Sequence, residues 1–147
     1  MDKLDYIKKA NQINEVISFE ISQYIEMSLL NDLTPKQQMC VMYLSNVQRT
    51  STNKIAEILN ISKSSMSQLL KRLENNAYIV RTINPDNRKE VFVELGQAGK
   101  TYTETYNKLI EDVFEKYFSV VTKEEAKFMC DLNEKILNHV IQEKNKK

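Results

Sequence analysis

Residues 53–74 read NKIAEILNISKSSMSQLLKRLE, and this stretch says most about the fold of the chain. Its apolar residues recur at helical spacing as far as Leu59 and start again at Met66. Asn60, which lies between them, tolerates the left-handed backbone conformation of a sharp turn, and Ser62 is a common N-cap residue. The pattern therefore predicts two short helices joined by a tight turn, which is a helix-turn-helix.

The second of these helices would expose a polar face made of Ser62–Ser65, Ser67, Gln68 and Lys71. Short polar side chains allow a helix to lie deep in a DNA major groove, which is about 12 Å wide, whereas bulky side chains would hold it away. This face therefore favours a DNA-reading helix. The alternative is an ordinary helical hairpin, in which the serines only cap the helix and contact solvent.

Residues 78–95, YIVRTINPDNRKEVFVEL, hold the period-two alternation that is typical of strands. Turn residues at 84–87 separate the two runs, which predicts a two-stranded hairpin with Arg88 and Lys89 at its tip. A hairpin directly after a helix-turn-helix is a wing, and Arg88 is placed to enter an adjacent minor groove, where A·T-rich tracts concentrate negative potential. We expect Asp86 to cap the turn and hold the Arg88 guanidinium; a solvated loop charge is the alternative for Arg88.

Helices are also predicted before this segment. Residues 4–29 carry apolar residues at every third or fourth position, which indicates one long helix. Thr34, Pro35 and Gln37 form a capping box with proline at the first helical position, and they open the next helix. A polar loop, RTST at 49–52, is expected to connect that helix to the helix-turn-helix.

Two more long helices are predicted after Gly99, and the second opens with another capping box, formed by Thr122 and Glu125. The helices at both chain ends are more apolar than a surface helix needs to be. A second copy of the chain, packed about a twofold axis, would cover these faces economically. The expected assembly is therefore a homodimer.

The predicted fold class is mainly α with a small β-hairpin wing. Residues 33–96 would form a winged helix-turn-helix DNA-binding domain, and residues 1–32 and 97–147 a helical dimerisation region. The charge distribution agrees, because residues 36–90 carry nine Lys or Arg against four Asp or Glu, a net charge of +5 in a chain of net charge +1.

The composition of the 147 residues, 41% hydrophobic and 28% charged, favours a soluble cytoplasmic protein without a membrane segment. Cys40 and Cys130 lie in apolar helical patterns, so buried free thiols are expected, with a redox-sensing thiol as the alternative. His139 has no neighbour at metal-ligand spacing, so no metal site and no cofactor are expected. Paired carboxylates, a nucleophile with a histidine base and a glycine-rich phosphate loop are all missing, which argues against an enzyme.

The stretch from Leu33 to Gly99 resembles the MarR family (multiple antibiotic resistance regulators), which are bacterial winged helix-turn-helix dimers. The matching pieces are LTPKQ at 33–37, IAEILNIS at 55–62, MSQLLKRLE at 66–74, IVR at 79–81 and PDNRKEVFVEL at 85–95, followed by the closing glycine. The last piece contains the family's Asp-x-Arg wing signature as Asp86 and Arg88. The flanking helices match in length and placement rather than in motif.

The resemblance implies a homodimer that binds a pseudo-palindromic operator in double-stranded DNA and represses transcription. By position, Arg88 would enter the minor groove, with Asp86 and Lys89 beside it on the wing. Gln68 is the main candidate for a base contact, because its amide can pair with adenine through two hydrogen bonds. The face toward the major groove would comprise Ser64, Ser65, Ser67, Gln68 and Lys71, and the expected phosphate contacts are Lys63, Lys71 and Arg72.

The chain departs from the family pattern at three places. Many relatives have Thr-Arg where this chain has Ser67 and Gln68, which puts the family's contact at that point in doubt. Ala77 replaces a glycine, so Asn76 is expected to take over the left-handed helix cap. Gly96 replaces a threonine cap, at an expected cost of a few tenths of a kcal/mol.

Relatives often release DNA when a small, frequently phenolic, effector occupies a crevice between the dimer helices and the winged lobe. Phe19, Tyr24, Met39 and Tyr43 are the candidates for such a pocket, and they would suit a core equally well. The rival to a DNA-binding repressor is a winged-helix module that uses the same face to bind another protein.

Overall fold

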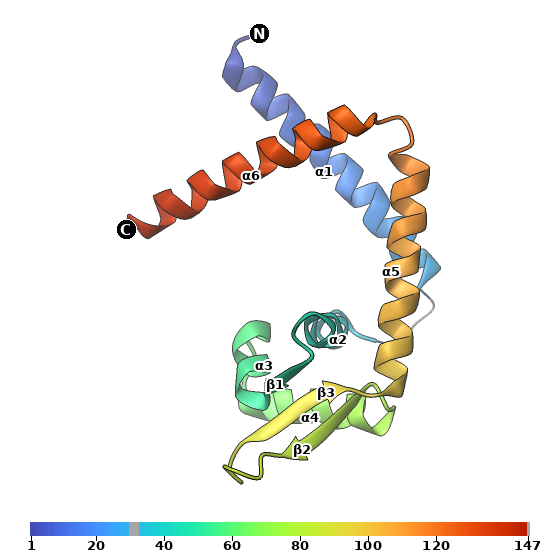
Figure 1. The fold of residues 1–147 in the computed structure, drawn as a ribbon, viewed down its shortest axis with the longest axis vertical. Helices are drawn as coiled ribbons and strands as arrows, with labels where there is room; N and C mark the ends of the chain where they lie inside the picture. The colour runs from blue at the N-terminus through green and yellow to red at the C-terminus, as the bar shows by residue number, and fades with distance from the viewer. Residues whose placement is uncertain (30–32, 147) are drawn as a thin grey trace. The chain divides into compact units, whose positions relative to one another are not determined.

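The computed structural model describes residues 1–29 and 33–146 of the chain. Figure 1 shows the helices and strands in chain order. They are α1 (Lys3–Ser28), α2 (Pro35–Val47), β1 (Arg49–Ser51), α3 (Thr52–Leu59), α4 (Lys63–Asn75), β2 (Ile79–Ile83), β3 (Val91–Leu95), α5 (Gln97–Tyr117) and α6 (Lys123–Asn145). This content confirms the predicted class, mainly α with a small β wing. Met1–Ile110 and Glu111–Lys147 form two compact units.

The hydrophobic core of the first unit lies among α2, α3, α4 and the strands. α2 contributes Cys40, Val41 and Leu44, and each is at most 1% exposed. The other core residues come from both helices of the helix-turn-helix and from the sheet. They include Ile55, Leu59, Met66, Leu70, Leu73, Ile79 and Val93. One shared core therefore holds the helix-turn-helix against the wing.

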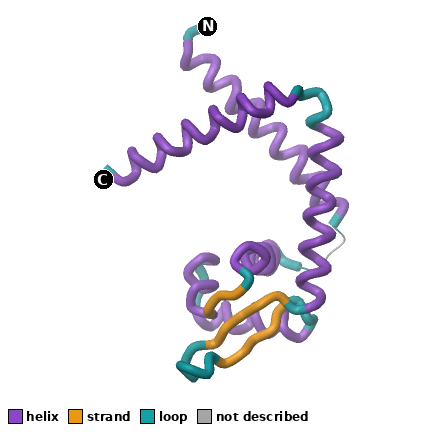
Figure 2. Tube along the Cα trace, viewed as in Figure 1, coloured by secondary structure: helices purple, strands orange, loops and turns teal. Residues whose placement is uncertain are grey.

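The sheet has three strands rather than the predicted two. Its order is β1-β3-β2, and both pairings are antiparallel, as Figure 2 shows in orange. Arg49 of β1 lies opposite Glu94, and Ile79 of β2 lies opposite Leu95. The expected polar loop at 49–52 is thus wrong, because Arg49–Ser51 form β1 and Thr52 begins α3. A strand of three residues is too short to show an alternation, and its partner is far along the chain.

Side-chain caps start the helices where the sequence indicates. Both predicted capping boxes are present: the Thr34 N–H donates to Gln37 Oε1 at 2.9 Å, and the Thr122 N–H donates to Glu125 Oε2 at 2.9 Å. Ser62 caps α4, as predicted, since its Oγ accepts the Ser65 N–H at 3.1 Å. Local hydrogen bonding therefore sets these boundaries.

The end of α4 differs from the expectation. Asn76 has φ −101° and is not left-handed, whereas Ala77 has φ 60°. The reason is a Schellman cap with Ala77 at its left-handed position, in which the Tyr78 N–H donates to the Leu73 carbonyl at 2.9 Å. α5 begins against this cap, since the Ala77 carbonyl accepts the Ala98 N–H at 3.0 Å. A Cβ added to Gly96 would lie 2.3 Å from the Ala77 carbonyl oxygen, and one added to Gly99 would lie 2.2 Å from that of Tyr78. Both glycines are therefore required where α5 begins against the end of α4. Gly96 is not simply an acceptable substitute for a threonine cap, because no side chain fits at its position.

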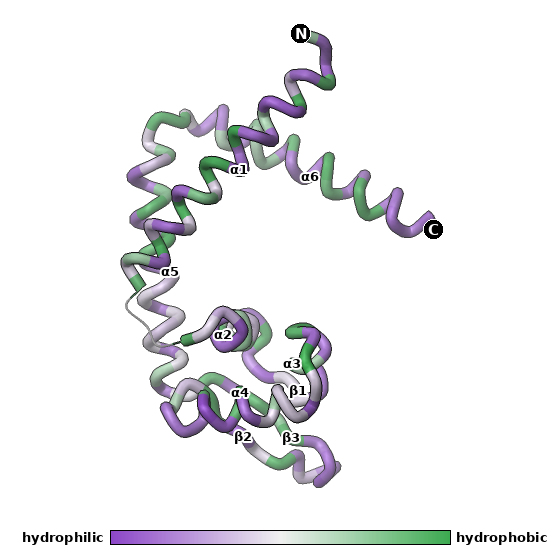
Figure 3. The backbone as a smooth tube through the Cα atoms, turned by 180° about the vertical axis from the view of Figure 1, so that it is seen from behind, coloured by the Kyte–Doolittle hydropathy of each residue, from purple (hydrophilic) through white to green (hydrophobic). Residues whose placement is uncertain are grey.

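The two longest helices bury nothing within the described chain. Neither α1 nor α6 has a buried residue, although apolar residues recur along both, as Figure 3 shows in green. On α6, the apolar residues that remain exposed are Phe128, Met129, Leu132, Ile136, Leu137, Val140 and Ile141. Of the helices that the structure describes, none is long and apolar enough to span a membrane.

The two cysteines differ in environment. Cys40 is buried, as predicted, and burial raises the pKa of its thiol to about 12, so it stays protonated and unreactive at neutral pH. Cys130 is exposed, which contradicts the expectation. It lies on α6, whose apolar residues are not covered by the described part of the chain.

Candidate nucleic-acid interface

The helix-turn-helix owes its geometry to a short turn between α3 and α4. Asn60 adopts the predicted left-handed conformation, with φ 50° and ψ 52°, and the Ile61 N–H donates to the Ala56 carbonyl at 3.1 Å. Lys36, at the start of α2, donates from Nζ to the Leu59 carbonyl at 2.7 Å. This lysine satisfies a carbonyl at the end of α3, a role that its sequence neighbourhood did not reveal.

α4 separates its two faces as the sequence predicts. Met66, Leu70 and Leu73 point into the core. The polar residues singled out on this helix are all exposed: Lys63, Ser64, Ser65, Ser67, Gln68, Lys71 and Arg72. The helix therefore presents a continuous surface of hydroxyl, amide and cationic groups.

These polar side chains are not equally available. Ser65 is engaged at the helix start, where the Ser62 hydroxyl donates to its Oγ at 3.1 Å. Within residues 1–29 and 33–146, the side chains of Ser64, Ser67 and Gln68 make no hydrogen bond to the rest of the chain. Their donors and acceptors are therefore open to an external partner, which is what reading base edges requires.

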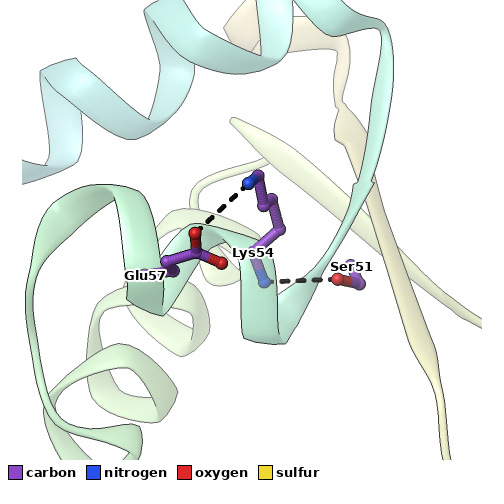
Figure 4. Close-up of polar contacts among 3 residues, drawn as sticks. All are labelled: Ser51, Lys54 and Glu57. Carbon is purple, nitrogen blue, oxygen red and sulfur yellow. Dashed lines mark hydrogen bonds and ion pairs between the residues drawn. The ribbon is translucent and has the colours of Figure 1, made fainter. Parts of the chain in front are cut away.

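The start of α3 adds polar groups that the sequence analysis did not single out. Ser51 caps this helix, since its Oγ accepts the Lys54 N–H at 3.2 Å, and Lys54 Nζ lies 3.4 Å from Glu57 Oε1. Figure 4 shows both contacts as dashed lines. Asn53 and Lys54 are exposed beside this cap. The sequence signal for this N-cap is a serine directly before an apolar-periodic run, which also fits the polar loop expected there.

The wing tip is organised by Asn84 rather than by Asp86. The Asn84 Oδ1 accepts the Asp86 N–H at 3.0 Å, and its Nδ2 donates to Glu90 Oε2 at 2.9 Å. Arg88, Lys89 and Asp86 are exposed at the tip, which is part of the teal loop after β2 in Figure 2. In the described residues the Asp86 carboxylate makes no hydrogen bond or ion pair with Arg88, so the predicted hold on the guanidinium is wrong.

An ion pair joins α4 to the wing. Arg81 of β2 donates to Glu74 through Nε at 3.1 Å and through Nη2 at 2.9 Å. These hydrogen bonds lower the pKa of the Glu74 carboxyl, while partial burial opposes them. The carboxylate is therefore ionised at neutral pH, and the pair is charged on both sides.

The predicted effector residues lie apart from the cavity that the structure describes near α1. Phe19 and Met39 are exposed, Tyr24 is 38% exposed, and Tyr43 is half-buried. The cavity, of about 470 Å³, is lined by residues of α1, α2 and α5 that include Ile25, Leu29, Pro35, Gln38 and Tyr106. None of the four predicted residues lines it, so their role stays a prediction.

The described residues hold no cluster of His, Cys, Asp or Glu that could bind a metal ion. What they do hold is a helix-turn-helix with an open polar face, followed by a hairpin with a cationic tip. This combination defines a winged helix-turn-helix protein.

Comparison with known proteins identifies the class further. The model of the MarR family matches residues 33–91 of this chain. The HTH-type transcriptional regulator YvnA of Bacillus subtilis is 28% identical over 110 residues, which are 75% of this chain and 70% of YvnA. Two other regulators from the same bacterium are matched over 52% and 61% of their length. The relatives that the chain resembles here are named as HTH-type transcriptional regulators.

Solved structures show the same fold. YusO from Bacillus subtilis has a TM-score of 0.74 at 19% identity, and the match covers 94% of this chain and 99% of YusO. A mutant of MepR from Staphylococcus aureus, bound to an oligodeoxyribonucleotide, has a TM-score of 0.67 at 23% identity, with 89% and 97% of the two chains covered. The predicted fold is therefore confirmed, and the predicted resemblance to the MarR family is confirmed over residues 33–91.

Proposed function

We propose that this protein is a sequence-specific DNA-binding repressor that acts as a homodimer on a pseudo-palindromic operator. The observation that carries the proposal is the exposed face of α4, where Ser64, Ser67 and Gln68 keep their hydrogen-bonding groups open beside Lys71. Exposed serine and glutamine side chains also hydrogen-bond to water, and what distinguishes this face is that it lies beside cationic residues and precedes a hairpin with a cationic tip.

The roles divide by chemistry. Gln68 and the serines would contact base edges in the major groove, because amide and hydroxyl groups match the donors and acceptors displayed there. Lys63, Lys71 and Arg72 would contact phosphates, which position the protein without specifying sequence. The start of α3, with Lys54, is a further candidate for phosphate contacts, since the first helix of a helix-turn-helix crosses the DNA backbone. Arg88 would enter the minor groove, with Lys89 and Asp86 beside it.

Dimerisation is proposed from the uncovered helices. Apolar residues of α1 and α6 remain exposed, for example Ile7 at 55% and Ile136 at 53%. Contiguous apolar surface of this extent is rare on monomers and marks interaction sites. A second copy is the proposed partner, with residues 1–32 and 97–147 as the dimerisation region and 33–96 as the DNA-binding domain. A DNA-binding repressor of this kind would act in the cytoplasm.

Release by a small phenolic effector is the regulatory part of the proposal. What supports it is the match to the MarR family model and the cavity near the end of α1. The lining of this cavity combines the aromatic ring of Tyr106 and apolar residues such as Ile25 with polar groups such as Gln38, which could orient a small aromatic molecule.

Selection of bound sequences from random DNA tests the proposal directly. We expect an inverted repeat whose half-sites lie about 10 base pairs apart. Affinity for the selected site should fall roughly 10³-fold between about 50 and 200 mM salt if a dimer neutralises about six phosphates. Failure to enrich any sequence, or a flat response to salt, would instead favour a winged-helix module for protein binding.

A variant at the wing tip tests the assignment of roles. Arg88→Ala should weaken operator binding by about 1–3 kcal/mol per half-site, because a desolvated minor-groove contact is lost. Lys135→Ala on α6 removes the same charge far along the chain and serves as the matched control. Sedimentation should give the same oligomeric state for both variants. Normal binding by Arg88→Ala would contradict the wing assignment.

A further inference from the structure

Glu74 and Arg81 form an ion pair that connects the DNA-facing helix to the wing. Glu74 lies in the last turn of α4, and Arg81 is the central residue of β2. Their two hydrogen bonds, at 3.1 and 2.9 Å, form a fork between one guanidinium and one carboxylate. Other ion pairs of the described residues join neighbours on one helix or its C-cap, as Lys54 and Glu57 do, or two strands, as Arg49 and Glu94 do.

A forked pair constrains orientation as well as distance, because two parallel N–H···O bonds cannot both form if either group rotates. The side chains of Arg81 and Glu74 are 30% and 38% exposed, so the pair lies partly sheltered between the helix and the strand. The apolar contacts nearby, such as those of Leu73 and Ile79, stabilise the packing of α4 against β2 but do little to fix their relative orientation. The fork therefore adds a directional side-chain link between α4 and β2, beside the backbone hydrogen bond from the Tyr78 N–H to the Leu73 carbonyl at 2.9 Å.

The position of the fork makes it sensitive to the wing angle. Gln68 lies on α4 before Glu74, and Arg88 lies on the tip beyond the end of β2 at Ile83. The three residues from Arg81 to Asn84 extend about 10 Å at strand spacing, so a rotation of about 10° at the fork would move the tip by about 2 Å. A shift of that size is enough to lose a contact inside a groove.

We propose that Glu74 and Arg81 are positioning residues that hold the wing at the angle at which Gln68 and Arg88 reach their two grooves together. This inference rests on the proposed DNA-binding function. It assigns neither residue a contact with DNA. It predicts instead that the pair acts on affinity through Arg88.

A double-mutant cycle measures this dependence. Glu74→Gln keeps the size of the side chain and removes the charge that the fork requires. We expect it to weaken operator binding roughly 3- to 30-fold in the wild-type background, and by less than about 2-fold when Arg88 is already alanine. A role in general stability would give the same loss in both backgrounds. Thermal unfolding of each variant verifies that the protein is folded at the assay temperature.

Two further variants serve as controls. Glu94→Gln removes the carboxylate of the Arg49–Glu94 pair, which has a similar N–O distance of 2.8 Å but joins β1 to β3, so it should leave affinity unchanged. Arg81→Lys keeps the charge and loses the fork. It should bind DNA more weakly than wild type, whereas a purely electrostatic role would leave its affinity intact.

The wing angle can also be measured without DNA. Nitroxide labels at Asn75→Cys and Asn87→Cys, in a chain with Cys130→Ser, report the distance between the end of α4 and the tip. We expect Glu74→Gln to broaden this distance distribution and Glu94→Gln to leave it unchanged. An unchanged distribution in Glu74→Gln, or equal affinity losses with and without Arg88, overturns the positioning role alone. Failure of the wild type to bind any DNA would overturn the proposed function, and the spin-label distances would still decide whether the fork holds the wing.

Discussion

Apolar residues of the winged lobe, residues 33–96, are covered within the chain, whereas within the described residues those of the terminal helices α1 and α6 are not buried. α3 has only 8 residues and α4 has 13, yet both bury apolar residues in the shared core. α1 and α6 have 26 and 23 residues, and within the described chain neither buries any. Short helices are thus fixed by their neighbours in the same lobe, while the long ones carry apolar residues that their own chain leaves uncovered. Length and periodicity alone do not reveal where a helix finds its partner.

This contrast has a direct consequence for stability. The core of the lobe is made by contacts within one chain, so its stability should not depend on protein concentration. The proposed dimer interface would bury the residues of α1 and α6 only on association, so their contribution should depend on concentration. The predictions below test this difference.

The largest effect is expected from charges placed on the apolar residues of α6. Leu132→Glu with Ile136→Glu should abolish self-association, because two carboxylates would have to be buried without partners. Sedimentation at micromolar concentration should then show a monomer. Asn138→Glu with Gln142→Glu adds the same charge to polar positions of α6 and should leave the dimer intact. A dimer that survives the first pair of substitutions would remove the basis for the proposed interface.

Leu70→Ala should destabilise the lobe itself. Leu70 is fully buried, and a leucine-to-alanine change in a core costs about 2–5 kcal/mol through lost burial and the cavity left behind. Urea unfolding followed by circular dichroism measures this loss. Leu137→Ala, made in the monomeric variant, is the matched control, since Leu137 is 57% exposed and should change stability by less than about 0.5 kcal/mol. Similar losses at both positions would erase the contrast between the regions.

A smaller gain is expected at the end of α4. Ala77 holds φ 60°, a conformation that costs an L-residue roughly 1–2 kcal/mol and costs glycine nothing. Ala77→Gly should therefore raise the free energy of unfolding by about 1 kcal/mol, less the added flexibility of the unfolded chain. Asn76→Gly is the control: its φ is −101°, and it would lose the hydrogen bond from Asn76 Nδ2 to the Arg72 carbonyl, so it should destabilise. A stabilising effect of Asn76→Gly would contradict the assignment of the cap.

The smallest effect concerns pH and the Glu74–Arg81 pair. Because the pKa of Glu74 is lowered in the folded protein, its contribution is present above the ordinary pKa of a glutamate, about 4.3, and is lost as pH falls through the lower folded value. Wild type should exceed Glu74→Gln in stability by about 0.5–1 kcal/mol at pH 7, given how exposed the pair is. The difference should shrink as pH falls from about 5 toward 3. Urea unfolding across this range measures it, and a difference that grows on acidification would show the sign to be wrong.

Several features could be predicted because their signals act within a few residues. The capping boxes at Thr34 and Thr122, the left-handed turn at Asn60 and the exposed face of α4 each depend on neighbours within about one helical turn. Family resemblance rested on the same local motifs, and the match over residues 33–91 confirms it.

Other features required the assembled chain. β1 is a strand because it pairs with β3, and Gly96 and Gly99 are required because α5 begins against the carbonyl groups of Ala77 and Tyr78. The pairing of Glu74 with Arg81 likewise depends on where β2 lies against α4. Hydrogen bonds between sequence neighbours follow from the local order of residue types, so the sequence predicts them. Contacts between distant segments form only when the chain folds, and no local pattern indicates which atoms will be in contact.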